Sequence, residues 1–411
     1  MKRYFKQLIG IIPVAILLSG CLNNLDTEVP QKENTKPDEV TVQTTANQLS
    51  SEHYRAVITD GSYELGASAS ADHQLSSASN TKAFEDGLLR ISKEIFPTDQ
   101  YYMQEGQLIN SNAMTSWLAR ESEDNPEGLN PALSKKESES RQDISSQESV
   151  DPASNPEGQE SENENESSEN EQVQVSESTP IYLAQILEKN IMVETDQGFA
   201  LGGIVIGLAM NSTYEYTDNE GVVYHQDISM GEMRERGKQY ANMIVGRLRN
   251  TEQLRSVPIV VGIYRLAPEN ENVGGTYVLD GISREGNSVT DWTDHNEHRV
   301  ALPATSDDAH QQYAYFDNFS DHVSNFFPNL NGISGEAFYI DNGLASLRIE
   351  IVTQFYQKSE ITALSQYVTD MAQQYLPEGV EIEIDIVSAT GTEAYVGRQA
   401  GSSQFESHVF Y

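Results

Sequence analysis

Residues 347–355 read Leu347-Arg348-Ile349-Glu350-Ile351-Val352-Thr353-Gln354-Phe355, in which apolar and polar side chains alternate. Successive side chains of a β-strand point to opposite faces of a sheet, so this period of two predicts a strand with one dry and one wet face. A second run, Val380-Glu381-Ile382-Glu383-Ile384-Asp385-Ile386, has the same alternation. Two half-buried strands of this kind predict a sheet with a single apolar face.

The segment between the two strands has the spacing of a helix. Its apolar side chains recur at intervals of three and four residues, and Pro377 and Gly379 then end the periodic run. A short partner strand is predicted at 394–397. The apolar positions of the predicted helix are Ile361, Leu364, Val368, Met371 and Tyr375.

The same order of elements is predicted once more, earlier in the chain. A strand at 204–210 is followed by a helix with Tyr240, Met243, Ile244 and Leu248 on one face, and then by strands at 258–264 and 275–279. We therefore predict an α+β fold with two tandem strand-helix-strand-strand repeats, an N-terminal α+β portion and a disordered acidic insertion. Chance recurrence of short patterns is the alternative to an internal duplication.

The N-terminal portion contains predicted helices and a predicted hairpin. Apolar side chains at Phe84, Leu88, Ile91 and Ile95 predict a helix that Pro97 ends. Three shorter features complete this part of the chain: a hairpin that pairs 101–103 with 108–109, a short helix at 115–119 that contains Trp117, and a short helix after Pro180 that contains Tyr182, Ile186 and Leu187.

The charge of the chain is concentrated in one segment. The 411 residues carry a formal net charge of −37, which argues against nucleic-acid binding because that function requires a basic surface. Residues 121–178 hold 17 acidic side chains against Lys135, Lys136 and Arg141. This run has few aliphatic side chains to bury, so we predict that it is disordered. A solvated loop is the simpler interpretation, and metal buffering or partner binding is the other.

The first residues have the order of a secretory signal. Lys2, Arg3 and Lys6 precede an apolar run from Leu8 to Leu18, and small residues follow. The apolar run is too short to cross a bilayer core, which needs roughly 20 residues. The sequence Leu18-Ser19-Gly20-Cys21 is typical of a bacterial lipobox, which predicts cleavage after Gly20 and a lipid on Cys21.

A lipid on Cys21 would decide the location of the mature protein. Two or more acyl chains give stable attachment, so we predict a lipid-anchored protein on the outer face of the cytoplasmic membrane. Cys21 is the only cysteine, and its acylation would leave none for an internal disulfide. The predicted segments are the signal peptide (1–20), a flexible tether (21–50), an N-terminal α+β segment (51–120), the acidic insertion (121–178), repeat 1 (179–290), a connecting region (291–343) and repeat 2 (344–411).

One polar cluster has residues that could bind a metal or act as acid and base. It contains Asp291, Asp294, His295, Glu297 and His298, and the spacing His295-x-x-His298 would suit zinc on a helical turn. The cluster lacks the His-Glu-x-x-His pattern, and its composition favours a surface loop. Asp307, Asp308 and His310 form a weaker group. We expect no catalytic residue, metal or cofactor, with His295 and His298 as weak metal-ligand candidates.

Aromatic side chains gather in the connecting region. They could bind a peptide or a glycan, although a place in the core is the commoner role for such a group. Its members are Tyr313, Tyr315, Phe316, Phe319, Phe326 and Phe327.

Three stretches carry a resemblance to a known family. They are Phe84-Glu85-Asp86-Gly87-Leu88-Leu89, Ser92-Lys93-Glu94-Ile95-Phe96-Pro97-Thr98-Asp99 and Ile206-Gly207-Leu208-Ala209-Met210-Asn211-Ser212. On these residues the chain resembles the CamS family of staphylococcal and bacillar sex-pheromone-precursor lipoproteins, from the lipobox to the C-terminus. The resemblance implies a membrane-anchored lipoprotein with tandem repeats, whose cleaved signal peptide acts as a conjugation pheromone toward enterococci.

Mapped onto this chain, the pheromone would be the heptapeptide Val14-Ala15-Ile16-Leu17-Leu18-Ser19-Gly20, and the alternative is an inactive remnant of the signal. We expect the mature part to be a non-catalytic binding module for an unknown protein or peptide partner. The alternatives are an envelope metal-dependent hydrolase that uses the 291–298 cluster, and a solute-binding protein.

Overall fold

A computed structural model describes ten stretches of the chain. They are residues 42–45, 48–59, 61–69, 75–133, 179–217, 221–268, 271–304, 312–327, 330–355 and 357–410. The lipobox, the heptapeptide, the signal peptide and residues 134–178 of the predicted insertion lie outside the described residues.

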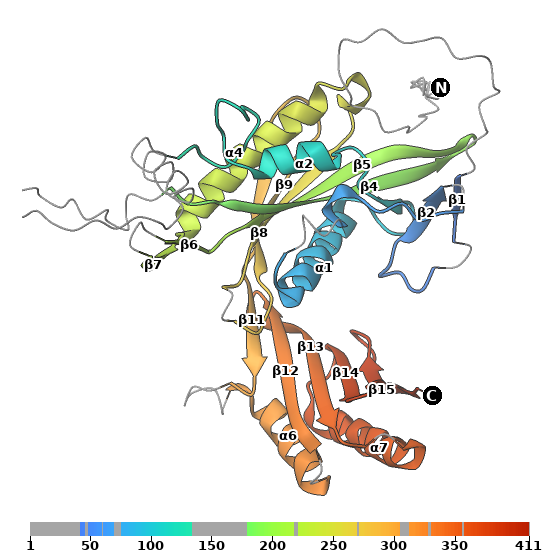
Figure 1. The fold of residues 1–411 in the computed structure, drawn as a ribbon. Coiled ribbons are helices and arrows are strands. Elements are labelled where there is room, and N and C mark those ends of the chain that lie inside the picture. The colour runs from blue at the N-terminus through green and yellow to red at the C-terminus, as the bar shows by residue number, and fades with distance from the viewer. Residues whose placement is uncertain are drawn as a thin grey trace, which may run out of the picture. The chain divides into compact units, whose positions relative to one another are not determined.

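The elements of the described residues are shown in Figure 1. In chain order they are β1 (Val42–Thr44), β2 (Arg55–Thr59), the 3-10 turn η1 (Ala67–Ala69), α1 (Ala78–Ile95), β3 (Tyr102–Glu105), α2 (Ser111–Leu118), β4 (Leu183–Thr195), β5 (Gly198–Met210), β6 (Thr213–Thr217), β7 (Val223–Asp227), α4 (Met230–Arg249), the 3-10 turn η4 (Glu252–Leu254), β8 (Ile259–Arg265), β9 (Thr276–Ser283), β10 (Thr290–Asp294), β11 (Glu297–Leu302), α6 (Ala314–Phe326), β12 (Leu330–Ile340), β13 (Gly343–Thr353), α7 (Lys358–Tyr375), β14 (Glu381–Ser388), β15 (Gly391–Arg398) and β16 (Glu406–Val409).

The described strands form three sheets. Their orders are β1-β2-β3-β4-β5-β8-β9-β10, β11-β12-β13-β14-β15-β16 and the ribbon β6-β7. The chain divides into two compact units. Of the described residues, unit 1 holds those within Met1–Leu75, Ile91–Ile263 and Ile282–Thr290, and unit 2 holds those within Ser76–Arg90, Tyr264–Gly281 and Asp291–Tyr411. The mixture of helices and sheets confirms the α+β prediction.

The core of unit 2 is built on the two alternating strands of the sequence. β13 and β14 pair in parallel, so that Ile349 lies beside Ile384 and Ile351 beside Ile386. A parallel pair needs a crossover connection, and α7 supplies it. The apolar residues of these strands, together with α6 and α7, form one buried cluster, while Arg348 and Glu350 on the other face are exposed. The predicted division into a dry and a wet face is therefore confirmed.

The element order of the two predicted repeats is also present. β5, α4, β8 and β9 occur in this order in unit 1 and at its boundary, with β6 and β7 between β5 and α4, and β13, α7, β14 and β15 follow one another in unit 2. Each set is preceded by a long antiparallel partner, β4 or β12, that the sequence did not predict. The helix expected after Pro180 is wrong, because Leu183–Thr195 is the strand β4, which is buried over most of its length.

The predictions for the N-terminal portion have mixed outcomes. The helix α1 lies where the periodic side chains placed it, and α2 contains Trp117 as predicted but begins at Ser111 instead of 115. The hairpin is wrong, because Tyr102–Glu105 pairs antiparallel with β4 and parallel with β2 instead of with 108–109. Figure 1 shows α2 and α4 on the same face of the β4–β5 hairpin.

The structure also differs from the predicted disorder over residues 121–133. Asn130 is fully buried, and its side-chain amide donates to the carbonyl oxygens of Leu118 and Leu183, at 2.7 and 2.9 Å. Its Oδ1 accepts from the amides of Tyr182 and Leu183. This one side chain satisfies backbone groups of two segments, which orders the first residues of the acidic run despite their charge.

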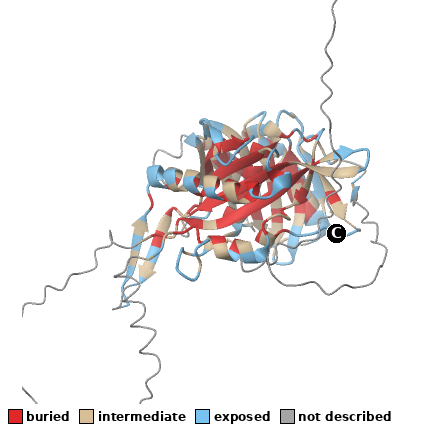
Figure 2. Ribbon diagram, turned by 90° about the horizontal axis from the view of Figure 1, so that it is seen from above, coloured by how far each residue is buried: buried red, intermediate tan, exposed pale blue. Residues whose placement is uncertain are grey.

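Buried residues are concentrated in the strands, as Figure 2 shows. Among the described residues, no helix combines the length and the apolar composition that crossing a bilayer requires.

Residues 108–109, predicted as a strand, form a loop whose backbone amides bond to a buried carboxylate. Glu188 of β4 is 2 % exposed, and its two oxygens accept from the amides of Leu108 and Ile109, at 3.0 and 2.8 Å. The amide of Gly106 donates to the Glu188 carbonyl oxygen at 3.1 Å. The loop after β3 therefore folds around this carboxylate. Burial raises the pKa of Glu188 to about 7, although the amide donors favour the charged form.

This raised pKa predicts a pH-dependent stability. Between pH 4.5 and 7 the folded chain holds a proton on Glu188 that the unfolded chain has released, so the free energy of unfolding falls as pH rises through this window. The contribution is at most about 3 kcal/mol. Denaturant unfolding at pH 4.5 and pH 8 should show this loss in the native chain relative to Glu188→Gln. An equal difference between the two proteins at both pH values would contradict it.

Candidate functional site

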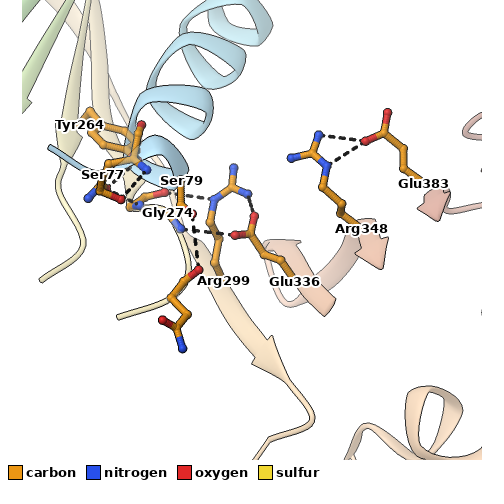
Figure 3. Close-up of polar contacts among 11 residues, drawn as sticks. Ser77, Ser79, Tyr264, Gly274, Arg299, Glu336, Arg348 and Glu383 are labelled. Atoms are coloured by element: carbon orange, nitrogen blue, oxygen red, sulfur yellow. Dashed lines mark hydrogen bonds and ion pairs between the residues drawn. The ribbon is translucent and has the colours of Figure 1, made fainter. Parts of the chain in front are cut away.

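The wet face of the six-stranded sheet carries a row of charged side chains. Glu336 of β12 lies beside Arg348 of β13, which lies beside Glu383 of β14. The Nε and Nη2 atoms of Arg348 both lie 2.9 Å from Oε2 of Glu383 (Figure 3). Both side chains are part-exposed, so this pair contributes little to stability and remains accessible to a ligand.

Arg299 of β11 extends the charged row toward the N-terminal end of β9. Its guanidinium lies 4.2 Å from the Phe338 ring centre and forms an ion pair with Glu336. Its Nε donates to the Gly275 carbonyl oxygen at 3.1 Å, and the Gly274 amide donates to Glu336 at 3.3 Å (Figure 3). The segment that leads into β9 is thereby bonded to the wet face of the sheet.

Asn80, in the first turn of α1, bonds to the same segment. Its Oδ1 accepts from the amides of Ala267 and Gly275, at 3.0 and 2.9 Å, and from the Tyr264 hydroxyl at 3.2 Å. Its amide nitrogen donates to the Ala267 carbonyl oxygen at 3.2 Å. Ser77 accepts from the Asn80 backbone amide at 3.2 Å, as a helix N-cap does. One buried carboxamide therefore fixes the start of α1 to the residues that flank β8 and β9.

The next turns of α1 rest on aromatic rings. The Phe84 ring centre lies 5.0 Å from that of Tyr264 and 6.1 Å from that of Tyr277. A Cβ on Gly87 would lie 2.5 Å from the Tyr277 ring, so the close approach of helix and ring requires glycine there. The stretch around Phe84 therefore packs the helix closely against two buried rings.

Acidic and basic groups of α1 interact with the charged row. Desolvation raises the pKa of Asp86, and the guanidinium groups of Arg348 and Arg299 oppose this shift. Burial raises the pKa of Asp385 of β14, and the ammonium group of Lys82, one turn earlier in α1, opposes this shift. We name the surface formed by Asp86, Arg299, Glu336, Arg348 and Glu383 the charged face; it is our candidate functional site.

The predicted metal-ligand pair does not converge. His295 Nε2 lies 2.7 Å from Asp280 Oδ1, while His298 stacks on Tyr339 with ring centres 4.7 Å apart. Glu297 forms an ion pair with Arg90 and accepts from the Tyr277 amide at 3.0 Å.

The surface loop expected over the 291–298 cluster is wrong, because Thr290–Asp294 and Glu297–Leu302 are strands. His295 lies in the connection between these two strands and His298 lies within β11, so the pair lacks the alignment that a helical turn would have given it. In the part of the chain that the structure describes, no three His, Cys, Asp or Glu side chains are placed to hold a metal. Nothing in the site geometry favours the hydrolase alternative, and Asp307, Asp308 and His310 lie outside the described residues.

The aromatic group divides between core and surface. Tyr313, Phe316 and Phe319 are buried in the core of unit 2. Phe326 is 59 % exposed and stacks on Tyr367 of α7, with ring centres 4.0 Å apart. The common core role holds for the first residues of α6, and the last turn of that helix is exposed to solvent.

The comparisons with known proteins identify the family. A family profile described as CamS sex pheromone cAM373 precursor matches residues 63–150 and 147–404. The chain belongs to the CamS family.

Solved CamS-family structures agree with this assignment. A sex pheromone precursor from Lactobacillus salivarius subsp. salivarius UCC118 is 33 % identical, with a TM-score of 0.76, and the match covers 90 % of this chain and 99 % of that one. The C-terminal domain of the sex pheromone staph-cAM373 precursor from Staphylococcus aureus is 25 % identical, with a TM-score of 0.61, over 81 % of this chain and 97 % of that one. A search of the curated proteins gave no match.

Sequence reasoning missed most of the charged face of this CamS-family chain. The alternation of β13 and β14 marked Arg348 and Glu383 as polar positions, but it did not show that they pair. Asn80 gave no signal at all, because the partners of its carboxamide lie 184 to 195 residues away in sequence.

The junction at Asn80 should be important for the stability of this CamS-family chain. Asn80→Ala leaves two buried backbone amides and one carbonyl without their partner, so the free energy of unfolding should fall by about 2–4 kcal/mol. Ser79→Ala removes a neighbouring hydroxyl with one long, exposed contact and should change it by less than about 0.5 kcal/mol. Urea denaturation of both variants tests this, and equal effects would contradict the role of Asn80.

Proposed function

We propose that this CamS-family chain is the precursor of a lipoprotein anchored to the outer face of the cytoplasmic membrane. The family's description as a sex pheromone precursor, together with the Leu18-Ser19-Gly20-Cys21 sequence, supports the proposal. Cleavage after Gly20 would separate the apolar leader from a mature chain that begins with Cys21. Acyl chains on the Cys21 sulfur would then hold the mature chain at the membrane.

In this proposal the leader supplies a peptide signal. The heptapeptide Val14-Ala15-Ile16-Leu17-Leu18-Ser19-Gly20 carries no charged side chain and is mostly apolar, which suits transfer along a membrane. Both products come from one cleavage event, so the same bond decides the location of the protein and the release of the peptide.

The mature part acts as a non-catalytic binding module that uses the charged face for a protein or peptide partner. The observation that carries this proposal is the arrangement of Glu336, Arg348 and Glu383 in one cross-strand row at the surface. Guanidinium and carboxylate groups in such a row offer donors and acceptors at fixed spacing, which favours recognition of a partner with complementary charges. The guanidinium and carboxylate groups of the row pair with one another across the strands, as the charged groups of a recognition surface do.

Mass spectrometry of the protein purified from membranes tests the anchor. We expect an N-terminal peptide that begins with Cys21 and carries the mass of a diacylglyceryl group, with or without an additional acyl group. Cys21→Ala should lose this mass and the matching peptide, because the sulfur is the point of attachment. A native N-terminus without a lipid, or an uncut leader, would contradict the proposed location and the proposed release of the heptapeptide together.

A further inference from the structure

The cross-strand row of Glu336, Arg348 and Glu383 continues to the far edge of the sheet, and a second row lies beside it. Beyond Glu383 the register leads to Gly397 of β15 and then to Glu406 of β16. The second row lies two residues farther along each strand. From β12 to β16 it contains Ser334, Glu350, Asp385, Tyr395 and His408. Because the strand residues between the two rows belong to the core of unit 2, both rows lie on the wet face.

The charge of these two rows is mainly negative. The guanidinium group in them is that of Arg348, and their carboxylates are those of Glu336, Glu350, Glu383, Asp385 and Glu406. Arg299 of the neighbouring strand pairs with Glu336, and α1 adds one charge of each sign through Lys82 and Asp86. An excess of carboxylates remains after these pairings, and Glu350 and Glu406 are exposed to solvent. Such a surface attracts a cationic partner and repels an anionic one.

An aromatic ring lies among these carboxylates. Tyr395 is opposite Asp385 in the register, and Gly397 is opposite Glu383. A Cβ on Gly397 would lie 2.1 Å from the Tyr395 hydroxyl oxygen and 2.4 Å from its Cζ, so the ring lies over the glycine. Desolvation raises the pKa of Tyr395, and the charges of Glu383 and Asp385 raise it further, in agreement with their place beside the ring. A cation over this part-exposed ring would interact with its π-face and with the carboxylates together.

The carboxylates of β14 have the spacing of an extended chain. Glu381, Glu383 and Asp385 alternate along this strand with buried isoleucines. Side chains on one face of a strand therefore recur at roughly 6.6 Å, which is twice the rise per residue. A peptide in the same extended conformation repeats the charges of every second residue at the same interval, so its cations can match these carboxylates one by one.

We propose that the partner bound at the charged face presents a basic, extended segment. Lysine or arginine at alternate positions of this segment pairs with the carboxylates of β14, and one of these cationic groups lies over the Tyr395 ring. The inference rests on the proposed function, in which the same face is the binding surface, and it adds the chemistry of the partner.

Fluorescence anisotropy of the full mature chain with a labelled decapeptide of alternating lysine and serine tests the pairing. The chain as a whole is acidic and attracts any polycation, so variants of equal net charge are compared. Glu383→Gln combined with Asp385→Asn should lower the affinity roughly fivefold, because both carboxylates are partners of the peptide. The matched control, Glu360→Gln combined with Asp370→Asn, removes two exposed carboxylates of α7 and should lower the affinity less than about twofold.

Two substitutions of Tyr395 test the ring in the same assay. Tyr395→Leu keeps an apolar side chain near Gly397 but removes the π-face, so the affinity should fall roughly threefold. Tyr395→Phe keeps the ring and should bind the decapeptide as the native chain does. Equal affinities of these two variants would overturn the role of the ring.

A larger loss of affinity in the β14 variant than in the α7 variant supports the basic segment. Equal losses in these two variants, or no binding of the decapeptide by the native chain, would overturn it. The proposed function is tested separately, by photo-crosslinking in intact cells from the exposed position Glu350. A specific adduct from that position, combined with equal losses in the two variants, would reject the basic segment and keep the charged face as the binding surface.

Discussion

The parallel pairing of β13 with β14 is the interaction on which unit 2 depends. It places Leu347, Ile349 and Ile351 in register with Ile382, Ile384 and Ile386, so that the apolar side chains of both strands form one continuous surface. Burying this surface under α6 and α7 is the main favourable contribution to folding of this unit. A shift of the register by one residue would turn every isoleucine toward water, so the pairing is strongly specified.

The same alternation that builds the core also builds the charged face. When one face of a strand is buried, its other residues must lie on the opposite face, and their chemistry is free of packing constraints. Arg348 and Glu383 occupy such positions, and α1 adds Asp86 to them. The Asn80 carboxamide fixes the start of α1, so a buried junction positions an acidic group near an exposed row of charges.

Whether the sequence could predict a feature depends on how far apart in the chain its interacting residues lie. Local periodicity was enough for α1, α7, β13 and β14, because the alternation and the helical spacing reflect burial of one face. It failed for β4, in which buried residues on both faces remove the alternation, and for the loop around Glu188, whose partners are 79 and 80 residues away. It also failed at His298, where the strand β11 replaced the expected loop. Function depends on such distant contacts, so the sequence predicted the fold class better than the site.

The central claim is that the charged face, and not the helical side of the same sheet, binds the partner of the mature chain. Photo-crosslinking in intact cells tests it, with a photoreactive phenylalanine derivative at the exposed position Glu350 of β13 or at the exposed position Gln373 of α7. We expect a specific adduct from position 350 that is absent from position 373. Adducts of the same mass and yield from both positions, or an adduct from position 373 alone, would contradict the account.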